Sequence, residues 1–355
     1  RMRLWIDLVN LPHIRLFSRL LRSHEDEIED VLISCRRLNF LPELASFLLP
    51  KYSEKMKIVG SHGISLADKL SKHLERILSL TKIVSEFSQD VAASKASPEL
   101  ARVAFGLGIP SVNLNDNDLS IHVSKLIFPL SQTIVVPEAF PDEVLAATGA
   151  VSRVRKFKGV AEVAHVLDYF ENAKEPETKS LEEPYIVARP APVGASYLRE
   201  ENPSPSFERA LIALVERIPR LKIYLFPREG FPISEKLRDH ITLIRNPRDS
   251  LALVSGAVAF LGASGTMTRE AALLGVPSIS MFPSPREPCV TQLLIDKGLV
   301  IKLMEPERVA EVVARYIEDE NARKSLKRRA IAFLDESEDP SEVLWEEIMR
   351  LSHRP

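Results

Sequence analysis

The fold of this chain is decided by residues 253–283, at whose centre stands Val258-Ala259-Phe260-Leu261-Gly262-Ala263-Ser264-Gly265-Thr266. An apolar run meets two glycines there, and a helical pattern follows at once from Met267 to Leu274. Gly275-Val276-Pro277 then leads into a second apolar run that ends at Phe282. This order predicts a strand, a glycine turn, a helix and a second strand.

The glycine turn predicts an anion site. Gly262 and Gly265 allow the backbone to come close to a ligand, and the start of a helix offers free amide groups and the positive end of a dipole. Glu270 lies one helical turn further on, at neither of the positions that a capping box from Ser264 or Thr266 requires. A carboxylate at this place can bind both hydroxyls of a ribose, so the segment predicts a nucleoside diphosphate site.

A structural alternative exists for the same helix. Thr268, Ala271, Ala272 and Gly275 share one face, and small residues let a helix pack closely on a sheet. Close packing accounts for the alanines but gives no reason for Glu270. We therefore favour the nucleotide interpretation and keep the packing interpretation open.

The composition is that of an ordinary globular protein, with 355 residues, 45% of them hydrophobic and 27% charged. This length suits about two domains. A formal net charge of −2 gives no overall basic field, so we expect no nucleic-acid partner. Cys35 and Cys289 are too few for a disulfide framework or a cysteine zinc site, which favours a cytoplasmic protein without a metal. No apolar run approaches the roughly 20 residues of a membrane span, and the N-terminus enters a strand pattern instead of a signal sequence.

Two series of alternating strands and helices are predicted, separated by a polar linker. Such alternation is typical of parallel sheets covered on both faces, with ligands bound at the carboxyl ends of the strands. The sequence thus predicts an α/β protein with two Rossmann-like domains that face a central cleft. We expect an N-terminal domain over 1–171, a linker over 172–184 and a C-terminal domain over 185–355, whose last helices could instead pack back on the first domain. The predicted strands are 3–9, 31–35, 57–60, 91–93, 111–114 and 133–136, then 185–188, 222–226, 241–244, 258–261, 278–281 and 299–301, and a long amphipathic helix is predicted over 65–87.

Two residues of the first series are candidates for acid–base chemistry. His13 follows the first strand, where an imidazole could take a proton from an acceptor hydroxyl at neutral pH, with Asp7 to orient it. The alternative is a surface histidine at a helix start. Asp116 lies in Asn115-Asp116-Asn117-Asp118 and could be a second base or bind a sugar hydroxyl, although such a run also suits an ordinary turn.

Two arginines of the second series are candidates for binding a diphosphate. Arg189 follows the first strand of that series and Arg228 follows the second, so both guanidinium groups could reach one anion. The alternative for each is a surface salt bridge.

The segment from Gly262 to Pro277 resembles the donor-binding segment of the lipid II N-acetylglucosaminyltransferase family and is similar to that of UDP-N-acetylglucosamine 2-epimerase, both GT-B proteins with two Rossmann domains. Over most of its length the chain resembles a prokaryotic family of unknown function related to that epimerase. The motifs that carry this likeness are Trp5-Ile6-Asp7, Asn10-Leu11-Pro12-His13, His62-Gly63, Asn115-Asp116-Asn117, Arg189-Pro190 and the glycine turn. The resemblance implies that Glu270 holds the ribose of a UDP-sugar and that Ser264, Gly265 and Thr266 approach its phosphates.

The chain departs from the epimerases at two places. Those enzymes carry a His-Gly-Asp motif after one strand and a glutamate after the next, whereas this chain has Lys95-Ala96-Ser97 and Asn113-Leu114-Asn115. Elimination of UDP by an epimerase needs acid and base carboxylates near the sugar, so we rank epimerase activity low.

These observations favour a metal-independent glycosyltransferase of GT-B type that uses no cofactor, binds a UDP-sugar and acts on an unknown acceptor. Glu270, Gly262, the rest of the glycine turn and the two arginines would hold the donor, while His13 or Asp116 would deprotonate the acceptor. The alternatives are a non-catalytic nucleotide-sugar sensor or scaffold, and an epimerase-like enzyme or hydrolase. A homodimer is an open alternative to a monomer.

Overall fold

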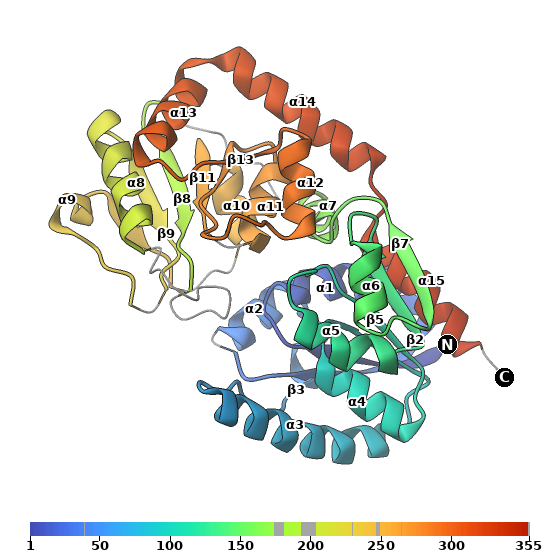
Figure 1. Ribbon diagram of the computed structural model, residues 1–355. Helices are drawn as coiled ribbons and strands as arrows, with labels where there is room; N and C mark the ends of the chain where they lie inside the picture. The colour runs from blue at the N-terminus through green and yellow to red at the C-terminus, as the bar shows by residue number, and fades with distance from the viewer. Residues whose placement is uncertain are drawn as a thin grey trace. The chain divides into compact units, whose positions relative to one another are not determined.

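The computed structural model describes residues 1–38, 40–173, 181–192, 204–228, 230–245, 249–263 and 265–353 (Figure 1). Residue contacts divide the chain into unit 1, Arg1–His165 with Ser337–Pro355, and unit 2, Val166–Glu336. The sequence pattern places the division later, around 172–184. Part of that segment, 174–180, lies outside the described residues, so the linker stays a prediction.

Unit 1 is built on a seven-stranded parallel sheet of order β3-β2-β1-β4-β5-β6-β7. Its strands are β1 (Met2–Leu8), β2 (Ile28–Cys35), β3 (Met56–Ile58), β4 (Val91–Lys95), β5 (Ser111–Leu114), β6 (Thr133–Pro137) and β7 (Arg153–Phe157). Its helices are α1 (His13–Ser23), α2 (Leu41–Leu48), α3 (Leu66–Phe87), α4 (Pro98–Leu107), α5 (Ile121–Ile127), α6 (Asp142–Ala147) and α15 (Pro340–Ser352). Short 3-10 helices are η1 (Glu25–Glu27), η2 (Ser53–Lys55) and η3 (Phe128–Leu130). Helix α7 (Glu162–Asn172) begins in unit 1 and ends in unit 2.

Alternate residues of the strands fill two separate cores in unit 1. Leu4 and Ile6 of β1 pack with α1, α2 and α15 on one face, whereas Trp5 packs with α3 and α4 on the other. This alternation follows from the period of two in a strand. Each face of the sheet is therefore covered by helices, as a parallel sheet requires.

The C-terminal helix α15 belongs to unit 1. Arg19 of α1 pairs with Asp339 at 2.7 Å, directly before α15, and the ring of His24 stacks on Trp345 with centroids 4.3 Å apart. Val343, Leu344 and other apolar residues of α15 join the same core as α1. The preceding helix, α14 (Glu320–Glu336), stays in unit 2.

Unit 2 is built on a six-stranded parallel sheet of order β10-β9-β8-β11-β12-β13. Its strands are β8 (Tyr185–Arg189), β9 (Lys222–Leu225), β10 (Ile241–Leu243), β11 (Ala259–Gly262), β12 (Ser278–Ser280) and β13 (Val300–Lys302). Its other helices are α8 (Ser204–Arg217), α9 (Glu235–Arg238), α10 (Ser250–Ser255), α11 (Gly265–Leu273), α12 (Cys289–Asp296) and α13 (Pro306–Glu318).

The predicted α/β class with two parallel sheets is confirmed. The strand, turn, helix and strand predicted around the two glycines are β11, the turn, α11 and β12. The long helix predicted over 65–87 is α3, which Ser65 caps by accepting a hydrogen bond from the amide of Asp68. Strand β7 is not predicted from the sequence, because its pattern Arg153-Val154-Arg155-Lys156-Phe157 is charged, as an edge strand allows. Within the described ranges, no helix has both the length and the apolar character that a membrane span needs.

Candidate functional site

The strand order reverses once in each sheet, between β1 and β4 in unit 1 and between β8 and β11 in unit 2. At such a switch point the connections leave on opposite sides, and the carboxyl ends of the two strands are open to a ligand. Most of the described candidate residues lie at or after the carboxyl end of a strand, whereas Glu270 lies further along α11: the former are His13, Asp116, Arg189, Arg228, Gly262, Gly265 and Thr266.

In unit 2, Arg189 and Gly262 end the two strands that flank the switch point. They lie opposite each other in the parallel register of β8 and β11, and Ser280 lies on the other side of Gly262 in β12. A side chain at Gly262 would clash, because a Cβ atom there would come within 2.6 Å of Oγ1 of Thr268. Glycine therefore lets the chain turn tightly from β11 into α11.

The start of α11 faces the same carboxyl edge. Gly265 and Thr266 form its first turn and are half-buried, so their backbone amides lie where a helix offers unsatisfied donors. Ser264 lies outside the described residues. These positions agree with an anion site but do not test it.

Glu270 is 5% exposed and lies in the part of α11, Thr268 to Leu273, that is buried on all sides. The neighbouring Arg269 donates to Oγ1 of Thr291 in α12 at 2.9 Å, which fixes α11 against that helix. Thr268 and Ala271 are also buried, and the carbonyl of Thr268 accepts from Oγ of Ser278 at 2.7 Å. The small face of α11 thus does pack closely, as the structural alternative predicted, and the role of Glu270 in binding ribose stays a prediction.

Arg189 and Arg228 are joined by reciprocal hydrogen bonds to each other's loops. Nη1 of Arg189 donates to the carbonyl of Pro227 at 3.0 Å, and Nε of Arg228 donates to the carbonyl of Pro190 at 3.3 Å. Burial, with a contribution from the charge of Arg228, lowers the pKa of Arg189 to about 9. No carboxylate is among the described groups that shift this pKa. Two guanidinium groups thus lie together at the switch point, and among the described residues Arg189 does not form the surface salt bridge considered for it.

In unit 1, the corresponding edge carries His13, Lys95 and Asp116. His13 begins α1, the helix that follows β1, Lys95 is the last residue of β4, and Asp116 follows β5. Nζ of Lys95 lies 3.0 Å from Oδ2 of Asp116, and the side chains are 7% and 9% exposed. Three ionisable groups are therefore gathered where β1 and β4 diverge.

His13 is buried, with 6% of its surface exposed, so the alternative that it is a surface histidine is wrong. Its Nδ1 has no hydrogen-bond partner within the described residues. Burial and the positive charge of Lys95 hold the pKa of His13 well below its usual range, against a smaller raising effect of Asp116. The imidazole is therefore neutral at neutral pH, which is the form that can accept a proton.

Asp7 does not orient His13, and that prediction is wrong. Its carboxylate pairs with Arg76 of α3 and accepts hydrogen bonds from Ser34 and Ser97. Asp7 lies inside β1, so its side chain is committed to the core between the sheet and α3. The carboxylate next to His13 is Asp116 instead.

Lys95 is the residue that sequence reasoning missed. In the sequence, Lys95 stands out only as a departure from the epimerase motif, which assigns it no role. The backbone of the next residue, Ala96, is left-handed with φ of 53°, a conformation that costs a non-glycine residue about 1 to 2 kcal/mol. Ser97 then caps α4 by accepting from the amide of Leu100. A charged residue that ends a buried strand beside a switch point was the signal that could have identified it.

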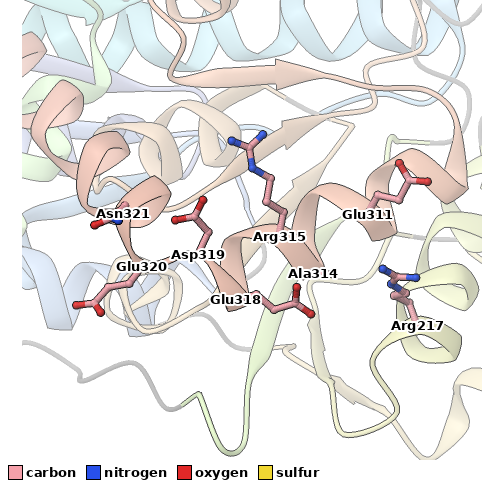
Figure 2. Close-up of a pocket in the computed structure, with 8 residues that line it drawn as sticks. All are labelled: Arg217, Glu311, Ala314, Arg315, Glu318, Asp319, Glu320 and Asn321. Atoms are coloured by element: carbon pink, nitrogen blue, oxygen red, sulfur yellow. The ribbon is translucent and has the colours of Figure 1, made fainter.

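A surface pocket of about 480 Å³ lies elsewhere on unit 2 (Figure 2). Arg217 at the end of α8 lines it, together with Glu311, Arg315 and Glu318 of α13. Both helices return from the carboxyl edge of the sheet, so their last residues lie at the opposite edge from the glycine turn. Because this wall mixes exposed charges of both signs, we assign the pocket no part in the chemistry.

Within the described residues, no three His, Cys, Asp or Glu side chains gather as a metal site would need. Cys35 is the buried last residue of β2, and burial raises the pKa of its thiol to about 12. It is therefore an inert core residue and not a nucleophile.

Comparison with known proteins identifies the family. Residues 2–352 match a family described as "Protein of unknown function (DUF354)". The chain belongs to this family. A relative from Methanocaldococcus jannaschii, named Uncharacterized protein MJ0665, is 30% identical over 357 residues, which cover 97% of each chain. The resemblance to a family of unknown function, inferred from the order of the short motifs, is confirmed.

Several solved structures share the fold of this DUF354 protein. The UDP-GlcNAc 2-epimerase of Neisseria meningitidis, bound to UDP-GlcNAc, has a TM-score of 0.71 at 16% identity and covers 98% of this chain and 100% of its own. The epimerase of M. jannaschii, in complex with UDP-GlcNAc and UDP, has a TM-score of 0.66 at 16% identity over 92% and 98%. The spinosyn forosaminyltransferase SpnP has a TM-score of 0.62 at 14% identity over 99% and 100%. At these identities the likeness establishes the GT-B-type fold of two Rossmann-like units and leaves the reaction open.

Proposed function

We propose that this DUF354 protein binds a UDP-sugar through unit 2 and transfers the sugar to an acceptor without a metal. The observation that carries the proposal is the pair Arg189 and Arg228 beside the glycine turn. Holding a half-buried guanidinium next to another cation costs free energy, as the pKa of about 9 for Arg189 reflects. A diphosphate bound there would recover that cost.

Each donor contact has a candidate residue in unit 2. The backbone at Gly262, Ser264, Gly265 and Thr266 would donate to the phosphates at the start of α11. Glu270 would accept hydrogen bonds from the ribose hydroxyls. The two arginines would neutralise the charge that develops on UDP as it leaves. Two solved structures with a similar fold contain UDP-GlcNAc, one of them also UDP, and this supports the choice of ligand.

The acid–base groups are those of unit 1. The neutral His13 would take the proton of an acceptor hydroxyl, whose oxygen forms a bond to the anomeric carbon while the bond from that carbon to the diphosphate oxygen breaks. The bonding electrons would leave with UDP. Asp116, held by Lys95 at 3.0 Å, would bind a hydroxyl of the acceptor or the sugar.

The buried trio in unit 1 favours an enzyme over a sensor. A protein that only senses a nucleotide sugar has no need of a buried neutral histidine beside an ion pair, whose desolvation costs stability. The same trio disfavours the epimerase, because Asp116 is engaged by Lys95 while Lys95-Ala96-Ser97 stands where the epimerase motif would be.

The proposal is tested first by binding and then by turnover. UDP and UDP-GlcNAc should each raise the melting temperature, since a ligand at about 100 times its Kd adds roughly 2.7 kcal/mol of stability. Arg189→Met should abolish most of this shift, whereas Arg217→Met, which removes an exposed guanidinium at the opposite edge of the same sheet, should leave it unchanged. Equal shifts in the two variants would refute the site.

Products then separate the possible reactions. Release of UDP that depends on added acceptor indicates a transferase. Release of UDP and free sugar without an acceptor would indicate a hydrolase or an epimerase. Binding without any turnover over a panel of nucleotide sugars and acceptors would indicate a sensor.

A further inference from the structure

Helix α3 has apolar residues on two opposite sides, and the core of unit 1 buries one side, which also carries Arg76. Arg76, Leu80 and Val84 are buried against the sheet. Leu66, Leu70, Leu74 and Leu78 form the second row, with exposed fractions of 86, 59, 56 and 61%. The rows are two residues apart in sequence, which is about 200° around the helix. An ordinary surface helix has a polar face at that position.

The helix cannot roll to bury this second row. Nε of Arg76 donates to the carbonyl of Val59 at 2.7 Å, and the same guanidinium pairs with Asp7. Gly60 has a left-handed φ of 75°, and a Cβ atom there would lie 2.8 Å from the Arg76 side chain, so the chain is shaped to admit that arginine. The leucine row is therefore held facing outward (Figure 1 shows α3 along the outside of unit 1).

We propose that the leucine row of α3, with the adjoining Ile64, is the contact surface for a second copy of this chain. Ile64 is 92% exposed. Together the five side chains present roughly 600 Å² of apolar surface, at the upper end of what a monomer leaves exposed. A standard interface buries about 800 Å² on each partner, so the row and its polar rim supply an area of the size that a stable dimer needs.

The row also fits a copy of itself. Residues spaced four apart form a ridge, and two such ridges interdigitate when helices cross at about −50°. Beside the ridge lie Ala67, Ser71 and Ser79, which are small enough to form a groove for the ridge of the partner, interrupted by the longer Glu75. Two copies related by a twofold axis through the middle of the row contact each other through the same patch. Such a dimer is closed and does not add further copies.

The charges on α3 argue against a membrane as the occupant. Apart from the buried Arg76, the helix has three acidic and three basic residues, Asp68, Glu75 and Glu86 against Lys69, Lys72 and Lys82. A helix that lies on an anionic membrane has a polar face rich in lysine and arginine. The balanced charges of α3 give no such attraction and cause no repulsion between copies.

The test is the mass of the whole protein by sedimentation over a roughly hundredfold range of concentration. We expect a dimer for the parent. Leu74→Glu, at the middle of the row, should give a monomer, and Leu70→Lys should do the same with the opposite charge. The matched control is Leu126→Glu on α5, a leucine of unit 1 that is 51% exposed and lies outside the row; it should remain dimeric.

Circular dichroism spectra decide whether each variant is folded, and a variant counts if its spectrum matches that of the parent and it unfolds cooperatively, at a lower temperature where the dimer is lost. A parent that is monomeric throughout would overturn the proposal, as would a folded Leu74→Glu or Leu70→Lys that stays dimeric. Flotation of the parent with vesicles of phosphatidylcholine and phosphatidylserine would overturn it in favour of a membrane. None of these results depends on UDP binding, so they are independent of the proposed function.

Discussion

Asp7 of β1 and Arg76 of α3 form a bidentate ion pair in which both side chains are 0% exposed. Nη1 of Arg76 lies 2.9 Å from Oδ2 of Asp7, and Nη2 lies 2.5 Å from Oδ1. Ser34 and Ser97 donate to the same carboxylate. Every strong acceptor site of Asp7 is thus used, and the pair fixes α3 to the sheet beside the switch point of unit 1.

Arg76→Met should destabilise unit 1 by about 3 to 5 kcal/mol, because it leaves the carboxylate of Asp7 buried without its cation. Asp7→Leu together with Arg76→Met should cost less than the sum of the two single changes. Trp5 and Trp345 are the two tryptophans of the chain and both lie in unit 1, so their fluorescence in urea follows this unit.

The control for this prediction is on the same helix. Lys72→Met removes the exposed pair with Glu75, whose atoms are 3.2 Å apart, and should cost less than about 1 kcal/mol. If Arg76→Met were as mild as Lys72→Met, the buried pair would not anchor α3.

Glu270→Gln should weaken UDP binding by about 1 to 3 kcal/mol, because a charged hydrogen bond to ribose becomes a neutral one. Titration calorimetry with UDP and with its 2′-deoxy analogue makes the test specific. The loss from the mutation and the loss from the missing hydroxyl should overlap and not add. Glu311→Gln, in the surface pocket of Figure 2, is the matched control and should bind both ligands as the parent does. Fully additive losses would show that Glu270 does not contact the ribose.

Binding of UDP should weaken as the pH rises through about 9. The pKa of Arg189 is lowered to about 9, so the guanidinium is charged below this pH and neutral above it. The diphosphate prefers the charged form, and binding above the pKa must therefore take up a proton, which lowers the affinity by up to about tenfold for each further pH unit. Calorimetry from near neutral pH to about one unit above the pKa measures the effect.

Arg189→Met separates this effect from ionisation of the ligand. The variant should bind UDP weakly at neutral pH and show a flatter pH dependence than the parent. The same slope in both proteins would mean that another group, on the ligand or the protein, is titrating.

The layers of the fold and the glycine turn could be predicted from the sequence because both depend on local patterns. Apolar runs such as Val258 to Leu261 are buried on both faces of a parallel sheet and stand out in any window. The edge strand β7 did not stand out, since its alternating charges are what an edge tolerates. The partners of Asp7 and of Asp116 could not be predicted in the same way, because Arg76 is 69 residues from Asp7 in sequence. Lys95 and Asp116 meet only once β4 and β5 are paired, which is tertiary information.

His13→Ala should lower turnover by about a hundredfold to ten-thousandfold while leaving UDP binding nearly unchanged. The imidazole belongs to unit 1, whereas the proposed donor contacts are all in unit 2, so removing it takes away the base without touching the diphosphate site. The measurement requires an activity first, then kcat from initial rates and the Kd of UDP from calorimetry on the same preparations. His122→Ala, an exposed histidine on α5, is the matched control and should behave as the parent.

Lys95→Met provides a second test of His13 as the base, measured by the pH profile of kcat. Removing the positive charge of Lys95 should raise the pKa of His13 and move the acidic limb of the kcat profile to higher pH. Unchanged turnover in His13→Ala would exclude it as the base and direct the search to Asp116, where Asp116→Asn is the next substitution to make.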